Sequence, residues 1–346
     1  MARDARRSTL VDIAASAGVS VSTVSKVLNG GTDVAAGTRA RIAGLLRQHG
    51  YQVASRLGFG VVDLLIADLH SPWAEELLRG TLEAANEAGL SVIATTVHSP
   101  SEFADWLDRA TARGTDGALC VLRLPGSREL RQLAAARIPL VMIDPATEPG
   151  DAIRSVGTTN WLGGMTATRH LIELGHRRVA MIGGPPDLWS SQARLDGYRA
   201  ALQAAGLGLD ETLVRRGDFM VAAGRARARE LLALPEPPTA VVAGNDSQAF
   251  GVLQALGERG LRAPDDLSVI GFDDVPVASW ATPALTTIRQ PLAAMAATAF
   301  RMLRSGPAAE PHHIELATTL VVRESTAPPR HDARGAGGYS NETTHI

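Results

Sequence analysis

Side chains that can hydrogen-bond to nucleic-acid bases recur along one side of a short helical pattern near the N-terminus. That side carries small donors and one cation: Ser22, Ser25, Lys26 and Asn29. The opposite side is apolar and holds Val24, Val27 and Leu28. Short polar groups and an ammonium on an exposed face suit a helix that enters a major groove, and Val21 at the boundary can touch a thymine methyl group. The alternative is an ordinary surface helix of a small bundle.

A second helical pattern precedes this one, and a short turn joins the two. Its apolar residues recur at helical spacing: Leu10, Ile13, Ala14 and Ala17. Gly18 can adopt the left-handed backbone that ends a helix, and Ser20 can cap the next one. A third helix is predicted over 38–51, where Ala35 lacks a capping oxygen and Thr38 supplies one instead. The three helices make a head with a helix-turn-helix motif.

The head is basic and the rest of the chain is acidic. Residues 1–58 carry eight basic and three acidic side chains, a net charge of +5. The remaining residues carry 26 basic and 33 acidic side chains, a net charge of −7. This division is expected when one module binds phosphates and the other avoids them.

From Val61 onward, apolar runs alternate with amphipathic helical patterns. The runs include VVDLLIAD, LSVIATTV, GALCVL, IPLVMID, RRVAMIGG, TAVVAGN and LSVIGFDD. Such runs predict parallel sheets with helices on both faces, and a break near 155–164 divides them into two lobes. Ligands of lobes of this kind bind beyond the carboxyl ends of the strands.

Several predicted strand ends carry aromatic, amide and carboxylate side chains. They are the loop containing Asp68, His70 and Trp73, the pair Asn160 and Trp161, and the pairs Asn245-Asp246 and Asp273-Asp274. An aromatic ring can stack on the apolar face of a sugar, and amides and carboxylates bind hydroxyls in fixed directions. Trp73 can instead pack in a core, and we expect Asp246 and Asp274 to cap helices.

The string TLVDIAASAGVSVSTVSKVLNG, residues 9–30, resembles the head of the LacI (lactose-repressor) family of transcription regulators. The resemblance implies that Val21, Ser22 and Lys26 read DNA bases. It also implies phosphate contacts from Thr9, Ser20, Thr23, Ser25 and Asn29. Later motifs extend the similarity across nearly the whole chain.

For the body, the resemblance implies a periplasmic-binding-protein-like core, in which two Rossmann-like lobes enclose an effector cleft. Cleft residues of the family correspond here to the loop with Asp68, His70 and Trp73, and to Arg194, Asn245 and Asp273. The guanidinium of Arg194 can hold two adjacent hydroxyls or a carboxylate. Asn160 and Trp161, where the lobes change over, complete the predicted effector site.

The linker at 52–60 departs from the family pattern. The usual linker is longer, contains Pro-Asn and forms a hinge helix whose leucine wedges into the minor groove. Leu57 is the wedge candidate here, but Gly58 and Gly60 flank it and no proline is present. A hinge helix and a short flexible tether are both compatible with this composition.

We therefore predict an α/β protein in three parts. Residues 1–58 form the helix-turn-helix head and a short hinge, 59–330 the effector-binding and dimerisation core, and 331–346 a disordered tail. Within the core, the N-terminal lobe takes about 59–160 and 290–318, and the C-terminal lobe takes 161–289 and 319–330.

Other functional classes lack the residues that they need. The chain has no HExxH, GxSxG or P-loop motif, no complete dinucleotide fingerprint and no metal pattern among its histidines, so we expect no catalysis, cofactor or metal. No apolar signal segment follows the N-terminus and no membrane-length apolar run occurs, so we expect neither export nor membrane insertion. One cysteine, Cys120, forms no disulfide framework, which fits a cytoplasmic protein.

The predicted function is a cytoplasmic, sequence-specific transcription regulator. Two chains pair as a homodimer, so that their heads bind half-sites about one turn apart on a palindromic double-stranded operator. A small-molecule effector, a mono- or oligosaccharide, closes the cleft and releases the DNA. One alternative is a corepressor-dependent regulator of the same family that responds to a nucleobase or another metabolite. An exported solute receptor would need a signal segment and has no use for the head.

Overall fold

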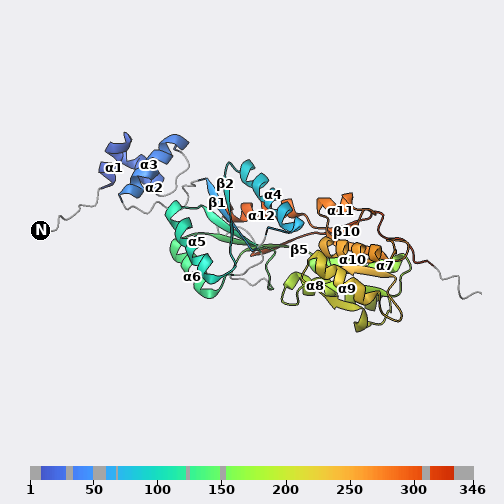
Figure 1. Ribbon diagram of the computed structural model, residues 1–346. Helices are drawn as coiled ribbons and strands as arrows, with labels where there is room; N and C mark the ends of the chain where they lie inside the picture. Colours follow the sequence, from blue (N-terminus) through green and yellow to red (C-terminus); the bar gives the residue numbers. More distant parts are fainter. Residues whose placement is uncertain are drawn as a thin grey trace, which may run out of the picture. The chain divides into compact units, whose positions relative to one another are not determined.

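The computed structural model describes residues 9–28, 34–49, 60–67, 69–121, 125–148, 153–305 and 312–330 (Figure 1). They fold as a helical head and two α/β lobes, which confirms the predicted fold class. Within these residues, no single helix is long and apolar enough to span a membrane. Two short helices near the N-terminus, Leu10–Ala17 and Val21–Leu28, reach that length and apolar composition only when taken together, and they are bent by 107° relative to each other.

The head contains three helices around a small apolar core. They are α1 (Leu10–Ala17), α2 (Val21–Leu28) and α3 (Ala36–Gln48). The buried core residues are Ile13, Ala14, Ala17, Val24, Val27, Ile42, Ala43 and Leu46, so the apolar sides predicted for the first two helices do face inward. The 107° angle between α1 and α2 lies in the range of a helix-turn-helix.

The turn of the motif is built by the predicted capping residues. Gly18 has φ 64°, and its backbone N–H donates to the last carbonyls of α1. Ser20 Oγ accepts from Thr23 N at 3.2 Å at the start of α2. The predicted third helix is present as α3, but its predicted cap was wrong, because the helix begins at Ala36 and Thr38 therefore lies inside it. The Ala35 carbonyl accepts from Arg39 N at 2.9 Å in its first turn.

The first lobe is built on a six-stranded sheet in the order β11-β5-β4-β3-β1-β2. Its strands are β1 (Val61–Ile66), β2 (Ser91–Thr96), β3 (Gly117–Val121), β4 (Leu140–Ile143), β5 (Ser155–Thr158) and β11 (His313–Leu316). Neighbouring strands from β2 to β5 pair in parallel. Its helices are α4 (Pro72–Glu87), α5 (Pro100–Arg113), α6 (Ser127–Ala136) and α12 (Leu292–Ser305).

The second lobe repeats this plan in the order β12-β10-β9-β8-β6-β7. Its strands are β6 (Val179–Gly183), β7 (Val214–Arg216), β8 (Ala240–Ala243), β9 (Ser268–Asp273), β10 (Thr286–Arg289) and β12 (Thr319–Val321). All neighbours pair in parallel except β10 and β12, which are antiparallel. Its helices are α7 (Asn160–Glu173), α8 (Trp189–Ala204), η1 (Glu211–Leu213), α9 (Val221–Leu231), α10 (Asp246–Glu258) and α11 (Pro276–Trp280).

Helices cover both faces of the second sheet, which explains why its strands read as continuous apolar runs. One core cluster joins α7 and α8 to the sheet through residues such as Leu171, Tyr198 and Phe272. The other joins α9 and α10 to the opposite face, with Leu231 and Val252 fully buried. The carboxyl ends of the parallel strands are thereby held in a fixed arrangement.

The chain passes five times between two compact units, twice around the short segment 71–73 and three times further along. The first unit takes the described residues within 1–70, 74–157 and 292–316, and the second takes those within 71–73, 158–291 and 317–346. We call the passages at 157/158, 291/292 and 316/317 the three crossings. Four predictions lie outside the described residues: the role of Asn29, the Leu57 wedge with its hinge helix or tether, the effector role of Asp68, and the disordered tail at 331–346.

Candidate DNA-reading head and effector site

The outward face of α2 presents the side chains that the sequence singled out. Val21 is 42% exposed, and Ser22 and Lys26 are also exposed, whereas Val24 and Val27 are fully buried on the opposite side. A methyl-bearing side chain, a hydroxyl and an ammonium therefore share the solvent side of one helix. Such a face can contact base edges in a major groove.

A cluster of hydroxyls lies at the N-terminus of α2. Ser20 Oγ is 2.8 Å from both Ser22 Oγ and Thr23 Oγ1. At the start of α1, Thr9 is exposed and forms a capping box with Asp12, in which Thr9 N donates to Asp12 Oδ2 at 2.7 Å. Hydroxyls and backbone N–H groups at a helix N-terminus bind phosphate oxygens. Ser25 is half-buried on the same helix.

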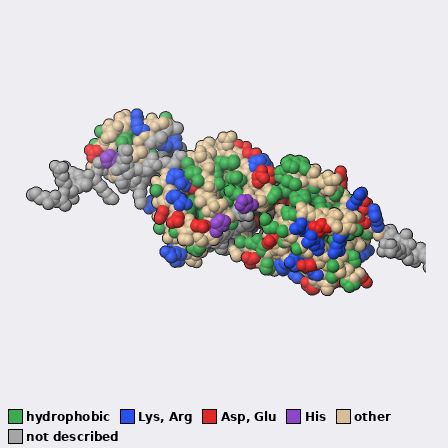
Figure 2. Space-filling model, viewed as in Figure 1, with side chains coloured by type: hydrophobic (Ala, Val, Ile, Leu, Met, Phe, Trp, Pro, Cys, Tyr) green, Lys and Arg blue, Asp and Glu red, His purple; other side chains and the backbone are tan. Residues whose placement is uncertain are grey.

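Many basic side chains on the second lobe are paired with acids. Figure 2 shows blue and red groups side by side over this lobe. Arg229 donates two hydrogen bonds of 2.7 Å to Glu258, and Arg215 and Arg227 both pair with Glu230. Neutralised surfaces of this kind attract phosphates weakly. The electrostatics thus favour the head as the DNA-binding module.

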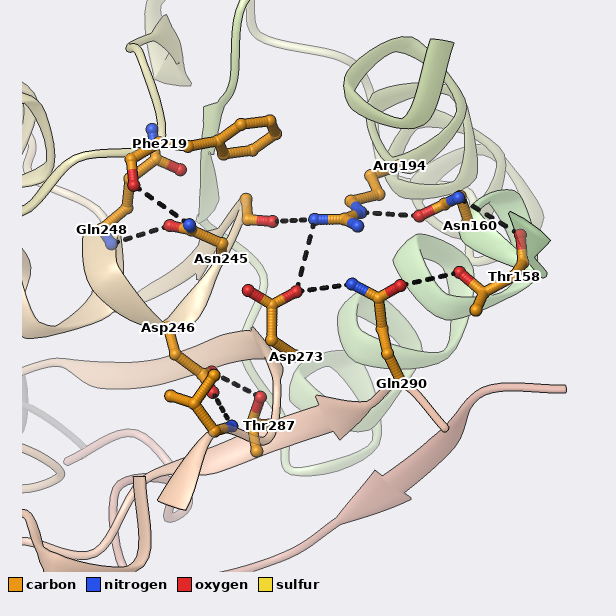
Figure 3. Close-up of polar contacts among 12 residues, drawn as sticks. Thr158, Asn160, Arg194, Phe219, Asn245, Asp246, Gln248, Asp273, Thr287 and Gln290 are labelled. Carbon is orange, nitrogen blue, oxygen red and sulfur yellow. Dashed lines mark hydrogen bonds and ion pairs between the residues drawn. The ribbon is translucent and has the colours of Figure 1, made fainter. Parts of the chain in front are cut away.

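In the second unit, five polar residues form a closed ring, which we call the polar ring: Thr158, Asn160, Arg194, Asp273 and Gln290 (Figure 3). Arg194 Nε donates to Asn160 Oδ1 at 2.8 Å, and Asn160 Nδ2 donates to the Thr158 carbonyl at 3.2 Å. Thr158 Oγ1 donates to Gln290 Oε1 at 2.9 Å, and Gln290 Nε2 donates to Asp273 Oδ1 at 2.6 Å. The ring closes where Arg194 Nη1 lies 3.9 Å from Asp273 Oδ1.

Every member of the polar ring is buried, with at most 5% of each side chain or residue exposed. Thr158 ends β5, Asp273 ends β9 and Gln290 directly follows β10, while Asn160 begins α7 and Arg194 lies near the start of α8. The ring therefore sits at the carboxyl ends of the strands, where open α/β lobes bind ligands.

Arg194 is held on all sides. Its Nη1 donates to the Gly244 carbonyl at 2.7 Å, and its guanidinium carbon lies 3.7 Å from the centre of the Phe272 ring and 5.6 Å from that of Phe219. A buried guanidinium needs such compensation, because removing it from water is costly. The result is a preorganised set of donors beside the carboxylate of Asp273.

Asp273 has an unusual backbone. Its φ is 120° and that of Asp274 is 59°, conformations that residues with a Cβ rarely adopt. Neighbours hold this turn: Gln290 N donates to the Asp273 carbonyl at 3.1 Å, and Arg289 and Arg323 each donate to the Asp274 carboxylate at 2.6 Å. Strained backbone that is held this firmly is typical of ligand sites.

The predicted capping roles of Asp246 and Asp274 were wrong. Asn245 caps α10 instead, with Oδ1 accepting from Gln248 N at 2.9 Å, and its Nδ2 donates to the Phe219 carbonyl. Asp246 is fully buried and accepts from Thr287 Oγ1 at 2.6 Å and from Val275 N at 3.0 Å. Burial, reinforced by the charge of Asp273, raises the pKa of Asp246 well above its usual value. Asp274 pairs with arginines, as described above.

The structure brings four of the predicted effector residues together. Asn160, Arg194 and Asp273 are ring members, and Asn245 follows Gly244, whose carbonyl Arg194 contacts. The remaining predicted residues are outside the ring. Trp161 is 46% exposed, His70 is exposed in the first unit, Trp73 is half-buried at the start of α4, and Asp68 lies outside the described residues.

Three residues of this site were absent from the sequence prediction: Thr158, Gln290 and Phe219. Phe219 follows β7, a strand of only three residues, which is too short to be recognised from the sequence. Its ring fills the space above Gly184, where an added Cβ would lie 2.1 Å from the Phe219 ring. The string Gly217-Asp218-Phe219 after the short segment Val214–Arg216 was the available signal.

Two family descriptions match the chain. Residues 9–53 match the bacterial regulatory proteins of the lacI family, and residues 168–326 match the periplasmic binding protein-like domain. The first covers the helix-turn-helix and the second covers most of the lobe that carries the polar ring.

Characterised relatives match over nearly their whole length. The ribose operon repressor of Escherichia coli K12 is 35% identical over 92% of this chain and 99% of its own. The regulator CelR of Thermobifida fusca is 36% identical over 92% of this chain and 98% of its own.

Solved structures agree with this assignment. A CelR-cellobiose complex is 35% identical, with a TM-score of 0.70 over 92% of this chain and all of that one. A lac repressor dimer bound to operator and the anti-inducer ONPF is 26% identical, with a TM-score of 0.68 over 93% of this chain and all of that one. The chain therefore belongs to the LacI family of DNA-binding transcription regulators.

Proposed function

We propose that this chain is a sugar-responsive repressor that works as a homodimer in the cytoplasm. Two heads occupy the half-sites of a palindromic operator, and a mono- or oligosaccharide in the effector site releases the DNA. The relatives support the sugar class, because one is named for the ribose operon and another was solved with cellobiose. The chain acts by binding, and no catalytic step is part of the proposal.

The polar ring is the observation that carries this proposal. In it the guanidinium of Arg194 donates to the amide oxygen of Asn160 and lies 3.9 Å from the carboxylate of Asp273, which accepts from Gln290. A sugar offers adjacent hydroxyls, each of which donates and accepts, so it can bond to the fork of Arg194 and to Asp273 at once. Aromatic rings nearby, such as Phe219, can cover an apolar sugar face.

In the head, we assign base contacts to Val21, Ser22 and Lys26 and phosphate contacts to Thr9, Ser20, Thr23, Ser25 and Asn29. The hydroxyl cluster at the start of α2 supports the phosphate role of Ser20 and Thr23. Each head covers only a half-site, and a pair of heads matches the symmetry of a palindrome. The solved lac repressor dimer on its operator supports this pairing.

Asp273→Asn tests the effector site. The substitution keeps the shape of the side chain but removes its charge beside Arg194, so we expect the thermal shift produced by ribose or cellobiose to disappear while affinity for a selected operator duplex stays within about twofold. Asp196→Asn on α8, whose side chain is 55% exposed, is the matched control and keeps the wild-type response. A response of Asp273→Asn at wild-type sugar concentrations contradicts the assignment.

A further inference from the structure

Thr158 and Gln290 lie beside the crossings as well as in the polar ring. Thr158 is the first residue of the second unit after the crossing at 157/158, and Gln290 is separated from the crossing at 291/292 only by Pro291. Their hydrogen bond joins two segments that are 132 residues apart in the chain. The ring thus ties candidate effector residues to the first two crossings.

The third crossing is joined to the same network. Thr318 N donates to Thr159 Oγ1 at 2.9 Å, and the two hydroxyls lie 3.0 Å apart. Thr159 directly follows Thr158, so hydrogen bonds within the second unit link all three crossing segments. Asp273 reaches this linkage through one side chain, Gln290.

We propose that Thr158 and Gln290 are positioning residues that couple occupation of Asp273 to the crossing segments, and through them to operator release. The inference rests on the proposed effector role of Asp273. An effector hydroxyl that donates to the Asp273 carboxylate competes with the 2.6 Å bond from Gln290 Nε2. Because the amide of Gln290 is planar and its Oε1 is bound by Thr158, turning it for one partner strains its bond to the other.

Because Thr158 and Gln290 are buried, their hydrogen-bond network should switch between two complete arrangements when the effector binds. Thr158 and Gln290 are 1% and 4% exposed, so water cannot readily replace a partner that moves away. A buried donor or acceptor that loses its partner is costly, and the network therefore favours complete arrangements over half-broken ones. Occupied and empty sites then correspond to two arrangements of the crossing segments.

Thr158→Val isolates the link, because it removes the hydroxyl that bonds to Gln290 and leaves the Gln290–Asp273 bond in place. Thr158→Ser retains the hydroxyl and is the conservative rescue. Thr286→Val is the matched control: Thr286 is also fully buried in the second unit and hydrogen-bonded, but at the amino end of β10, away from the ring.

The first measurement is amide hydrogen exchange of the ligand-free, full-length chain. In Thr158→Val we expect amides around 158, 290 and 318 to exchange about tenfold faster than in Thr158→Ser, because local opening of the crossing segments becomes easier. Thr286→Val leaves those amides at wild-type rates. Equal exchange in Thr158→Val and Thr158→Ser, or the same acceleration in Thr286→Val, overturns the proposal.

The second measurement is operator affinity with and without saturating cellobiose or ribose. The wild-type chain and Thr158→Ser lose about tenfold or more, whereas Thr158→Val loses less than about threefold, each protein being measured at a sugar concentration that saturates it. Wild-type release by Thr158→Val overturns the coupling. If the wild-type chain ignores both sugars, the proposed effector class is wrong, and the exchange comparison alone decides the role of the crossing segments.

Discussion

Lys26 stands out among single residues because it carries the only ammonium side chain in a chain with 33 arginines. It lies exposed on the same face of α2 as Ser22 and Val21. An ammonium is a compact charge that can reach guanine acceptors or a phosphate, but it lacks the two-pronged geometry of a guanidinium. Lys26 should therefore contribute to affinity for DNA and not to affinity for the effector.

Lys26→Ala should weaken binding to the selected operator by about tenfold or more, the range expected for one base contact in a major groove. The thermal shift given by the sugar should not change. Fluorescence anisotropy with a labelled operator measures the first quantity, and Arg131→Ala, which removes an exposed charge from α6, is the control. Wild-type operator affinity in Lys26→Ala would remove this residue from the reading face.

Sequence reasoning at the residue scale succeeded where one local rule decided the outcome. Gly18 and Ser20 build the turn of the head as expected, because left-handed backbone and N-capping depend on the residue itself. It failed at Asp246, because α10 begins at this residue, and the capping position is therefore the preceding one, Asn245. Asp246 is instead bonded to Thr287 and Val275, partners that only the folded sheet brings near.

At the scale of elements, the close packing of α7 on α8 sets the geometry of the proposed effector site. Two glycines allow the helices to touch: an added Cβ at Gly197 would lie 2.0 Å from the Trp161 carbonyl, and one at Gly164 would lie 2.2 Å from that of Arg194. Asn160 begins α7, and Arg194 lies one turn before Gly197 on α8. The helix spacing therefore determines how the two side chains meet.

Gly197→Ala should lower the free energy of unfolding by about 1–3 kcal/mol, because the added methyl group forces the two helices apart. It should also weaken sugar binding, since Arg194 moves relative to Asn160. Urea unfolding and sugar titration measure the two effects. Gly257→Ala on α10, where an added Cβ meets nothing within 4 Å, is the control and should be neutral or stabilising by up to about 1 kcal/mol. Equal behaviour of the two variants would contradict the argument.

His176 ties the last described segment to the second lobe. Its Nδ1 lies 2.9 Å from Thr239 Oγ1, and its Nε2 donates to the Ala327 carbonyl at 2.9 Å in the neutral tautomer that these partners favour. Burial lowers the pKa of His176, while the Ala327 carbonyl raises it and the neighbouring His170 lowers it further. The folded chain thus binds this proton less readily than the unfolded chain does.

His176→Gln should therefore make stability less dependent on pH. Because the pKa of His176 is depressed by folding, its contribution is complete above pH 6.5 and is lost as the pH falls through the unfolded and then the folded pKa. Asp246 acts in the opposite sense, since its pKa is raised. Comparing urea midpoints of the wild type and His176→Gln at pH 7.5 and 5.5 isolates the histidine; parallel pH dependence in both proteins would contradict the prediction.

Sequence patterns located most helices and strands but not the polar ring. Seven parallel strands were visible as apolar runs, most of them because they are buried on both faces, whereas β7 has only three half-buried residues. Thr158 and Gln290 carry no local signal, because their bond joins segments 132 residues apart. Arg194 was found only through the family resemblance, whereas Asp273 also stands at a predicted strand end.

For the whole molecule, function depends on a division of charge between two modules. The head carries a net charge of +5, while the remaining residues carry −7 and pair many of their arginines with acids. Phosphates should therefore be neutralised by the head alone. The polar ring, in contrast, is buried and would bind a neutral sugar. The two binding events should differ sharply in their response to salt.

Operator affinity should fall linearly with salt on a double-logarithmic plot, with a slope of about −5 or steeper for a pair of heads, because each neutralised phosphate releases about 0.9 of a counterion. Sugar affinity should change by less than about twofold over the same range of salt, since no net charge is exchanged at the ring. Anisotropy titrations with the operator and calorimetric titrations with the sugar, both between about 50 and 200 mM salt, measure the two slopes. A shallow operator slope would mean that few phosphates are contacted and that the basic head does not dominate binding. A steep sugar slope would instead place an anionic ligand in the effector site, beside Arg194.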